Sequence, residues 1–294
     1  NKTYSRRSAI KKIAALSAVT VIGDSITANV FGGKPDSSKR LKGNINHSVC
    51  RWCFQSFTLE ELCIVAKNIG INAIDLVGPK DWPILEKYHL YSSMCNGADI
   101  GIAKGWNDKK YHPILIKNYQ EIIPLVTKAG YRNLICLSGN RDGKDDEDGL
   151  QNCVEGLKQI MNMAEKNGVT IVMELLNSKV NHKDYQCDNT AWGVELAKRI
   201  NSENFKLLYD IYHMQIMEGD IIRTIRENQQ YIAHYHTGGV PGRNEIDESQ
   251  ELFYPAIMRA IVETGFKGYV AQEFIPKRED KISSLKQSIE ICDV

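Results

Sequence analysis

Acidic or imidazole side chains end four apolar segments in the second half of this sequence. These residues are Glu174 in TIVMEL, Asp210 in FKLLYD, His236 in YIAHYH and Glu273 in GYVAQEF. Burying several such groups together is very costly unless an opposite charge pairs them. A divalent cation would supply that charge. Three carboxylates and one imidazole form an oxygen-rich donor set that suits Mn2+, Mg2+ or Co2+, with Zn2+ as an alternative.

Two further histidines accompany this set. His213 follows Asp210 by three residues, at the point where the pattern turns helical. His234 lies two residues before His236, so both side chains share one face of a strand. His234 is open to two interpretations, as a residue near the substrate and the metal ligands or as a core histidine.

The elements that must position these residues alternate regularly along the chain. Apolar runs of strand length are separated by longer amphipathic runs, some with capping signals such as Thr58 and Glu61. The predicted strands are 48–54, 73–78, 91–97, 133–139, 170–175, 205–210, 231–236 and 268–274. The predicted helices are 58–70, 82–89, 112–130, 147–168, 190–200, 219–228, 251–265 and 281–292. Pro124 predicts a kink or break in the third helix.

This alternation predicts an α/β protein with a parallel sheet. Eight strand–helix units in one chain match a single closed (β/α)8 TIM barrel, spanning residues 47–294. The alternative is a doubly wound open sheet. Against it, neither the dinucleotide-binding glycine pattern nor a phosphate-binding loop motif occurs. In such barrels the chemistry lies at the carboxyl ends of the strands, where all four residues of the set fall.

The first 33 residues differ from the rest. Arg6-Arg7 and Lys11-Lys12 precede a short apolar stretch, which is the layout of an export signal of twin-arginine type, with cleavage near Ala28. Residues 34–46 read as a polar linker. We therefore expect a periplasmic or secreted protein, and a cytoplasmic one if the signal is not functional. The apolar stretch is too short for stable membrane insertion.

The charge balance limits the classes of binding partner, and the cysteines are considered with it. The 294 residues include 37 Lys and Arg against 36 Asp and Glu, so the net charge is +1 and no nucleic-acid partner is indicated. The charge balance favours a small molecule, and a homo-oligomer is left open. Of the eight cysteines, Cys50 and Cys53 form a CxxC on the first predicted strand, where their side chains would diverge.

Several motifs resemble a known family. ELLNSK (174–179), YDIYHMQ (209–215), VPGRNE (240–245) and QEF (272–274) are similar to the hydroxypyruvate isomerase branch of the xylose isomerase-like TIM barrels. That superfamily also contains ketose 3-epimerases, inosose dehydratases and endonuclease IV. The resemblance covers most of residues 47–292. It implies metal binding by Glu174, Asp210, His236 and Glu273.

The resemblance also implies a substrate-facing His213 and a substrate-contacting Arg243. Trp52 and Asn177 are further candidates for substrate contact, with the core and a capping role as their respective alternatives. The sequence departs from the branch in two places. Hydroxypyruvate isomerases often carry Gln where this chain has His236, which is similar to the epimerases, and the glycine-rich run expected after Arg243 is missing.

The predicted activity is a metal-dependent isomerisation of a small hydroxycarbonyl compound, hydroxypyruvate to tartronate semialdehyde, through an enediolate. Glu174 and Glu273 would act as base and acid on the two sides of the substrate. Arg243 would bind a substrate carboxylate. The alternatives are a ketose 3-epimerase acting on a free sugar and a sugar-binding barrel without catalysis, because a fold alone does not establish function.

Overall fold

A computed structural model of the chain describes residues 40–294, so the predicted export signal lies outside the described residues. Eight parallel strands close into a barrel in the order β1 to β8. Their bounds are β1 Asn46–Cys50, β2 Ala73–Val77, β3 Tyr91–Cys95, β4 Asn133–Cys136, β5 Thr170–Glu174, β6 Phe205–Asp210, β7 Ile232–Thr237 and β8 Tyr269–Gln272. The single parallel TIM barrel predicted from the alternation is confirmed.

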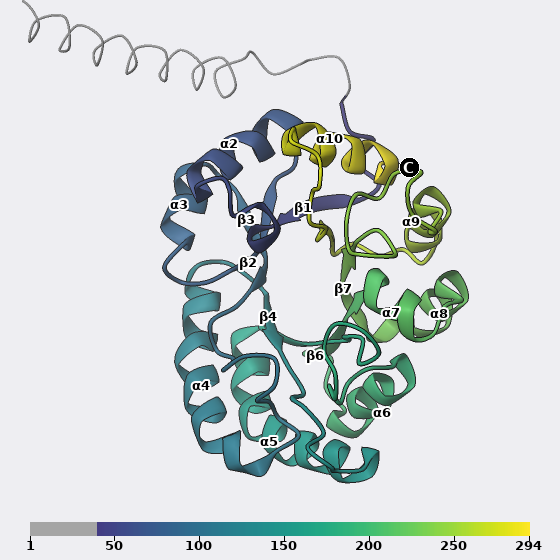
Figure 1. Ribbon diagram of the computed structural model, residues 1–294. Helices are drawn as coiled ribbons and strands as arrows, with labels where there is room; N and C mark the ends of the chain where they lie inside the picture. Colours follow the sequence, from purple (N-terminus) through teal and green to yellow (C-terminus); the bar gives the residue numbers. More distant parts are fainter. Residues whose placement is uncertain (1–39) are drawn as a thin grey trace, which may run out of the picture. The chain divides into compact units, whose positions relative to one another are not determined.

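Helices follow the strands and surround the barrel (Figure 1). The α-helices are α2 Leu59–Ile69, α3 Trp82–Lys87, α4 His112–Lys128, α5 Asp146–Asn167, α6 Thr190–Ile200, α7 Ile211–Met217, α8 Ile221–Asn228, α9 Tyr254–Glu263 and α10 Lys281–Cys292. Short 3-10 helices are η1 Arg51–Phe54, η2 Lys109–Tyr111 and η3 Gln229–Tyr231. The extra helix α7 begins directly after Asp210 and carries His213, so strand β6 passes into a helix at the site.

Local chemistry explains where these elements begin and end. Thr58 and Glu61 form the predicted capping box of α2, and Gly70 ends that helix in the left-handed region at φ 92°. Of the kink or break predicted at Pro124, the break is wrong, because α4 runs through this residue. Pro124 and Gln120, whose carbonyl loses its helical partner there, are both exposed, so water can satisfy that carbonyl.

The first predicted strand was too long. Strand β1 stops at Cys50, and η1 turns the chain so that Trp52 and Cys53 leave the sheet. The prediction that the two CxxC thiols diverge fails for this reason. Burial raises the pKa of Cys50, and a hydrogen bond between the Cys50 and Cys53 thiols raises it further. All eight cysteines lie in the described part of the chain, and all are buried with free thiols.

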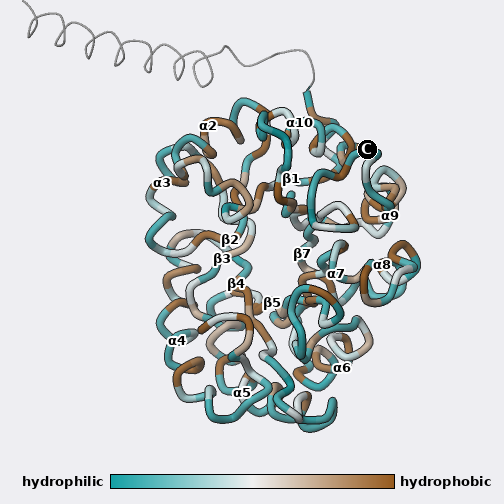
Figure 2. Tube along the Cα trace, in the orientation of Figure 1, coloured by the Kyte–Doolittle hydropathy of each residue, from teal (hydrophilic) through white to brown (hydrophobic). Residues whose placement is uncertain are grey.

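The barrel interior is filled by apolar side chains below the carboxyl ends of the strands. Met94, Ile135, Val172 and Leu208, from four neighbouring strands, form a buried cluster, and Figure 2 shows hydrophobic stretches in the central strands. The ends of the barrel domain also meet. The Lys42 amide, in the predicted linker, donates hydrogen bonds of 3.0 and 3.1 Å to the carboxylate of Asp293.

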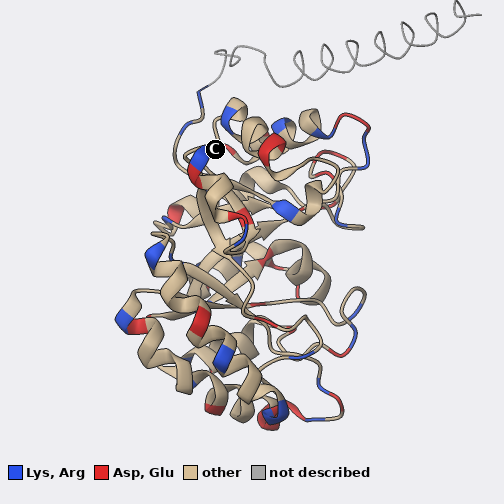
Figure 3. Cartoon of the chain, turned by 90° about the vertical axis from the view of Figure 1, so that its left-hand side faces the viewer, with Lys and Arg blue, Asp and Glu red and all other residues tan. Residues whose placement is uncertain are grey.

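The surface carries charges of both signs, as the net charge of +1 predicts. Basic and acidic residues are interspersed over the helices and loops of the face shown in Figure 3. Within residues 40–294, no helix combines the length and the apolar character needed to cross a bilayer.

Candidate metal centre and active site

The four strand-end residues converge on one point. Glu174 is the last residue of β5, Asp210 is the last of β6, His236 is the penultimate residue of β7, and Glu273 follows β8 directly. One ligand atom from each lies within 4.8 Å of those of the others. All four residues are at least nine-tenths buried. The four side chains singled out in the sequence therefore converge, each from the end of a different strand.

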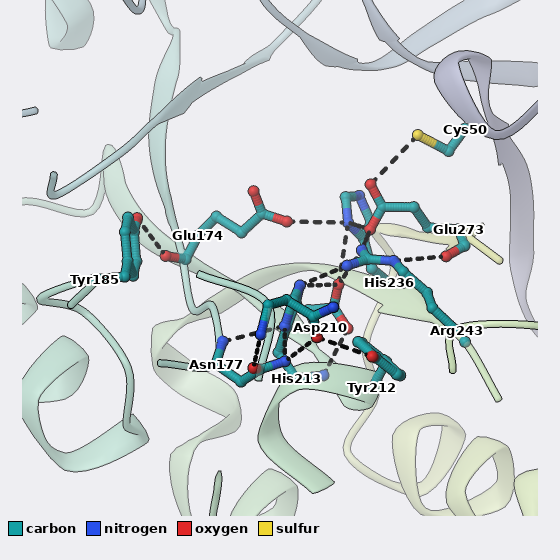
Figure 4. A network of polar contacts seen from close by, with 12 residues as sticks. Cys50, Glu174, Asn177, Tyr185, Asp210, Tyr212, His213, His236, Arg243 and Glu273 are labelled. Atoms are coloured by element: carbon teal, nitrogen blue, oxygen red, sulfur yellow. Dashed lines mark hydrogen bonds and ion pairs between the residues drawn. The ribbon is translucent and has the colours of Figure 1, made fainter. Parts of the chain in front are cut away.

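His236 lies at the centre of this cluster. Its Nδ1 is 2.6 Å from Glu273 Oε2, 3.4 Å from Glu174 Oε1 and 3.9 Å from Asp210 Oδ2. Figure 4 shows Glu174 and Glu273 approaching His236 from opposite sides. The two glutamates therefore flank the space in front of the imidazole, as an acid and a base on either side of a substrate would.

Arg243 supplies a positive charge to the same cluster. Its Nη2 is 2.7 Å from Asp210 Oδ2 and also contacts Glu273 Oε2, while its Nε donates to the Glu273 carbonyl oxygen at 3.1 Å. The guanidinium lies over the rings of Trp52 and Tyr212 at 5.5 and 5.1 Å. With only 8% of its surface exposed, Arg243 is a buried counter-ion rather than a solvated loop charge.

These contacts separate the acidities of the carboxylates. Burial raises the pKa of Glu174, and burial raises the pKa of Asp210 to about 7 although Arg243 opposes it. Burial would also raise the pKa of Glu273, but Arg243 and His236 hold it well below its usual range. The pKa values of Glu174 and Glu273 are thus shifted in opposite directions, which is the pattern of an acid and base pair.

A second acidic group, missed in the sequence, lies behind His236. Asp75 of β2 is fully buried, and its carboxylate oxygens are 2.9 Å from His236 Nε2 and 2.8 Å from His234 Nε2. The Ser93 hydroxyl donates to Asp75 at 2.6 Å. Asp75 fixes the imidazole so that Nδ1 faces the carboxylates, as in a carboxylate–histidine–metal arrangement. The signal available was an acidic residue inside the apolar strand AIDLVG.

His234, for which the sequence left two interpretations and which was also a candidate for substrate contact, lies behind His236. It is completely buried, contacts Asp75, and is not among the residues that line the cavity beside the cluster. Its position is correct for supporting His236 and wrong for direct contact with a substrate.

Asn177 and His213 lie together beneath the rim. The Asn177 backbone N–H is 3.1 Å from His213 Nδ1, and the Asn177 side-chain oxygen accepts from the amides of Val180 and Asn181, which is the capping alternative. Arg243 Nη1 is 2.5 Å from His213 Nε2, so each ring nitrogen has an N–H donor beside it, whereas a neutral imidazole accepts a hydrogen bond at one nitrogen only. His213 is fully buried and is not part of the cavity wall, so it contacts Arg243 rather than the cavity.

Trp52 joins the site from η1. Its indole N–H donates to Glu273 Oε1 at 2.6 Å, and Cys50 Sγ lies 3.5 Å from the same oxygen. Trp52 also lines the cavity together with Glu174, Arg243 and Glu273. Among the predicted substrate contacts, Trp52 and Arg243 thus reach the cavity wall.

The donor set fits a divalent cation by its chemistry and position. Three carboxylates and one imidazole nitrogen converge from separate strands, and the guanidinium of Arg243 already lies against two of them as a cation would. Glu174, Asp210, His236 and Glu273 are the residues that would hold the ion.

The fold and the site together define a (β/α)8 barrel with a carboxylate–imidazole centre at the carboxyl ends of β5 to β8. The family described as "Xylose isomerase-like TIM barrel" matches residues 65–293. The chain belongs to this family.

Individual relatives carry isomerase names. The chain is 27% identical over 132 residues to "Putative hydroxypyruvate isomerase" of Homo sapiens, covering 45% of this chain and 47% of the relative. It is 31% identical over 124 residues to "2-oxo-tetronate isomerase" of Cupriavidus necator, covering 42% and 47%. The chain spans about half the length of these curated relatives.

Solved structures share the fold. An AP endonuclease of family 2 from Brucella melitensis has a TM-score of 0.72 at 22% identity, covering 82% of this chain and 97% of that one. D-Psicose 3-epimerase with D-tagatose from Clostridium cellulolyticum H10 has a TM-score of 0.67 at 17% identity, covering 85% and 100%. At these identities the likeness establishes the barrel alone.

Proposed function

We propose that the protein is a metal-dependent isomerase of a small α-hydroxycarbonyl compound, of the hydroxypyruvate isomerase type. The observation that carries the proposal is the convergence of Glu174 and Glu273 from opposite sides onto one buried centre that borders a cavity. The isomerase names of the relatives support it at the level of reaction class. A cation held by the four strand-end residues would polarise the substrate carbonyl.

The chain's own residues account for the proton transfers. Glu273, ionised beside Arg243 and His236, takes the proton from the carbon next to the carbonyl. Glu174, whose pKa is raised by burial, faces the other side and exchanges the proton there. The guanidinium of Arg243, which lines the cavity and contacts His213, binds a substrate oxygen or carboxylate.

The experiment is solvent-deuterium exchange followed by NMR. With added Mn2+, the wild type should incorporate deuterium into hydroxypyruvate, and Glu273→Gln should lower the exchange rate at least about 100-fold. Glu248→Gln, on the loop between β7 and α9, is the control and should retain normal exchange. Normal exchange in Glu273→Gln would contradict the assignment, and no exchange in the wild type with any hydroxycarbonyl compound would leave a sugar-binding barrel instead.

A ketose 3-epimerase is the second candidate. It is favoured by His236, because a histidine at this position is similar to the epimerases, whereas hydroxypyruvate isomerases often carry Gln there. The same two glutamates would then remove and return a proton at carbon 3 of a free sugar. Incubating D-fructose with the protein and Mn2+ and resolving its C3 epimer by NMR distinguishes this reaction from isomerisation of the keto acid.

Export by the twin-arginine route remains part of the proposal, with residues 1–33 as the signal. Cell fractionation tests this proposal by measuring how much of the full chain is exported. A parallel strain produces the chain with Arg6 and Arg7 changed to Lys, and we expect its export to be lost. Export of both chains would show that the pair is not the signal.

A further inference from the structure

The cavity beside the candidate centre has two chemically different sides. Its volume is about 540 Å³. Glu174, Arg243 and Glu273 reach it from the β5 to β8 side, together with the polar Asn181 and His182 of the loop after β5. The opposite side, built from β2 to β4 and their loops with Leu176 beside them, presents mostly apolar side chains. These are Leu76, Ile102, Ile135, Leu137 and Leu176.

The two polar residues on the apolar side already have partners. The Asn96 side-chain amide donates to the Leu76 carbonyl oxygen at 3.0 Å. The Asp99 carboxylate accepts from the Gly101 amide at 3.0 Å. Asn96 and Asp99 keep further hydrogen-bonding sites of their own, but Leu76, Ile102, Ile135 and Leu137 offer none, so an apolar group would be removed from water against these four side chains.

The apolar character continues to the surface around the cavity mouth. Some large hydrophobic residues within residues 40–294 are more than one-third exposed. Five of them lie in segments that follow the carboxyl ends of strands. They are Trp52, Ile102, Val180, Phe253 and Ile275. Of these, Trp52, Ile102 and Ile275 also line the cavity, so its apolar wall is continuous with the surface at these three residues.

The volume exceeds what a three-carbon acid needs. Pockets of about 300–1,000 Å³ typically hold ligands of drug size. Hydroxypyruvate, with only a few non-hydrogen atoms, would contact the charged side and leave the apolar side uncovered. A hydroxycarbonyl compound whose whole surface is polar would bind less well, because those hydroxyl groups that face Leu76, Ile135 and Leu137 would lack hydrogen-bond partners.

We propose that the substrate is an amphipathic hydroxycarbonyl compound. Its hydroxycarbonyl head binds beside Glu174, Arg243 and Glu273, and an aryl or alkyl substituent lies against the apolar side and extends past Ile102 toward the rim. The chemistry of the head group rests on the proposed function, whereas the substituent is inferred from the cavity walls.

A series of 3-hydroxy-2-oxo acids tests this proposal by calorimetric titration of the Mn2+-loaded protein. The series consists of hydroxypyruvate and its derivatives with a methyl, propyl or benzyl group on C3. Burial of each added methylene should lower the dissociation constant up to about fourfold, so the propyl compound should bind about 10- to 60-fold more tightly than hydroxypyruvate.

Matched variants locate the effect. Ile102→Asn places an amide on the apolar wall and should remove most of the gain for the propyl and benzyl compounds, leaving hydroxypyruvate unaffected. Ile114→Asn makes the same change on α4 at a similar exposure, 43% against 38% for Ile102, away from the cavity. It should preserve the whole affinity series.

The outcomes separate the two proposals. Affinities that stay level or fall along the series, with normal deuterium exchange into hydroxypyruvate, would overturn the amphipathic substrate and leave the isomerase standing. Equal losses in Ile102→Asn and Ile114→Asn would also overturn it. Affinities that rise along the series without any deuterium exchange would support the amphipathic site and refute the isomerase.

Discussion

Replacing Asp75 by Asn should weaken metal binding although Asp75 is not one of the four candidate ligands. The carboxylate contacts His236 Nε2 at 2.9 Å and receives the Ser93 hydroxyl at 2.6 Å. It thereby keeps the Nε2 proton in place and leaves Nδ1 to face Glu174, Asp210 and Glu273. Asn offers one acceptor and one NH2 group in the same volume, so the negative charge is lost with little change in packing.

The magnitude follows from the type of contact. A hydrogen bond to a charged partner contributes about 1.5–3 kcal/mol net, and each 1.4 kcal/mol is a factor of ten in affinity. Removing the charge behind His236 should therefore raise the Mn2+ dissociation constant roughly 10- to 100-fold, which is the usual range for partners of metal-bound histidines. Turnover at saturating Mn2+ should fall less, because Asp75 touches neither the cavity nor the substrate.

Calorimetric Mn2+ titration of the purified protein measures this change, with circular dichroism to confirm folding. Asp188→Asn is the matched control. Asp188 is also a buried carboxylate, 6% exposed, but it pairs with Arg141 and Ser178 away from the cluster. The reasoning is refuted if Asp75→Asn binds Mn2+ as tightly as the wild type, or if both variants lose affinity equally.

Three further outcomes are expected. Arg243→Ala leaves buried carboxylates without their counter-ion, so urea unfolding of the metal-free protein should show a loss of about 3–5 kcal/mol that saturating Mn2+ reduces; an unchanged stability would contradict the ion pairing. Burial lowers the pKa of His47, so below about pH 6.5 the unfolded state takes up a proton that the folded state does not. Stability should therefore fall from pH 7 to 5, and His47→Gln should reduce that slope; identical slopes would exclude His47. Because the pKa of Asp210 is raised to about 7, Mn2+ binding in weak buffer near pH 6 should release protons, detectable with an indicator dye.

The sequence predicted the fold and the four strand-end residues for one physical reason. In a parallel barrel, every strand delivers its carboxyl end to the same rim, so residues far apart in the chain can be assigned to one place from local patterns alone. Glu174, Asp210 and Glu273 each ended an apolar run, and period and length sufficed to find those runs. Where local patterns were ambiguous, as in SVCRWCF, the strand end was misplaced by several residues.

Contacts between distant residues could not be derived in this way. Asp75 and His236 are separated by 161 positions, and nothing in AIDLVG indicates which histidine its carboxylate will face. Arg243 was expected to contact a substrate, but its pairing with Asp210 and Glu273 depends on how the loop after β7 folds back over the rim. Such contacts are fixed by tertiary packing, which periodicity does not report.

The difference between local patterns and tertiary contacts also explains why the sequence indicates a cation more clearly than it indicates a substrate. Four carboxylates, counting Asp75, face two positive groups, Arg243 and His236, and the pKa of His236 is held well above its usual value by Glu273 and Asp75 despite burial. The negative groups therefore outnumber the positive ones, and protons on Glu174 and Asp210 or a divalent cation must make up the difference. The carboxylates that need this compensation lie mostly at strand ends, which sequence patterns identify. The apolar side of the cavity comes from β2 to β4 and their loops, where leucine and isoleucine look the same in sequence whether they face the core or a ligand.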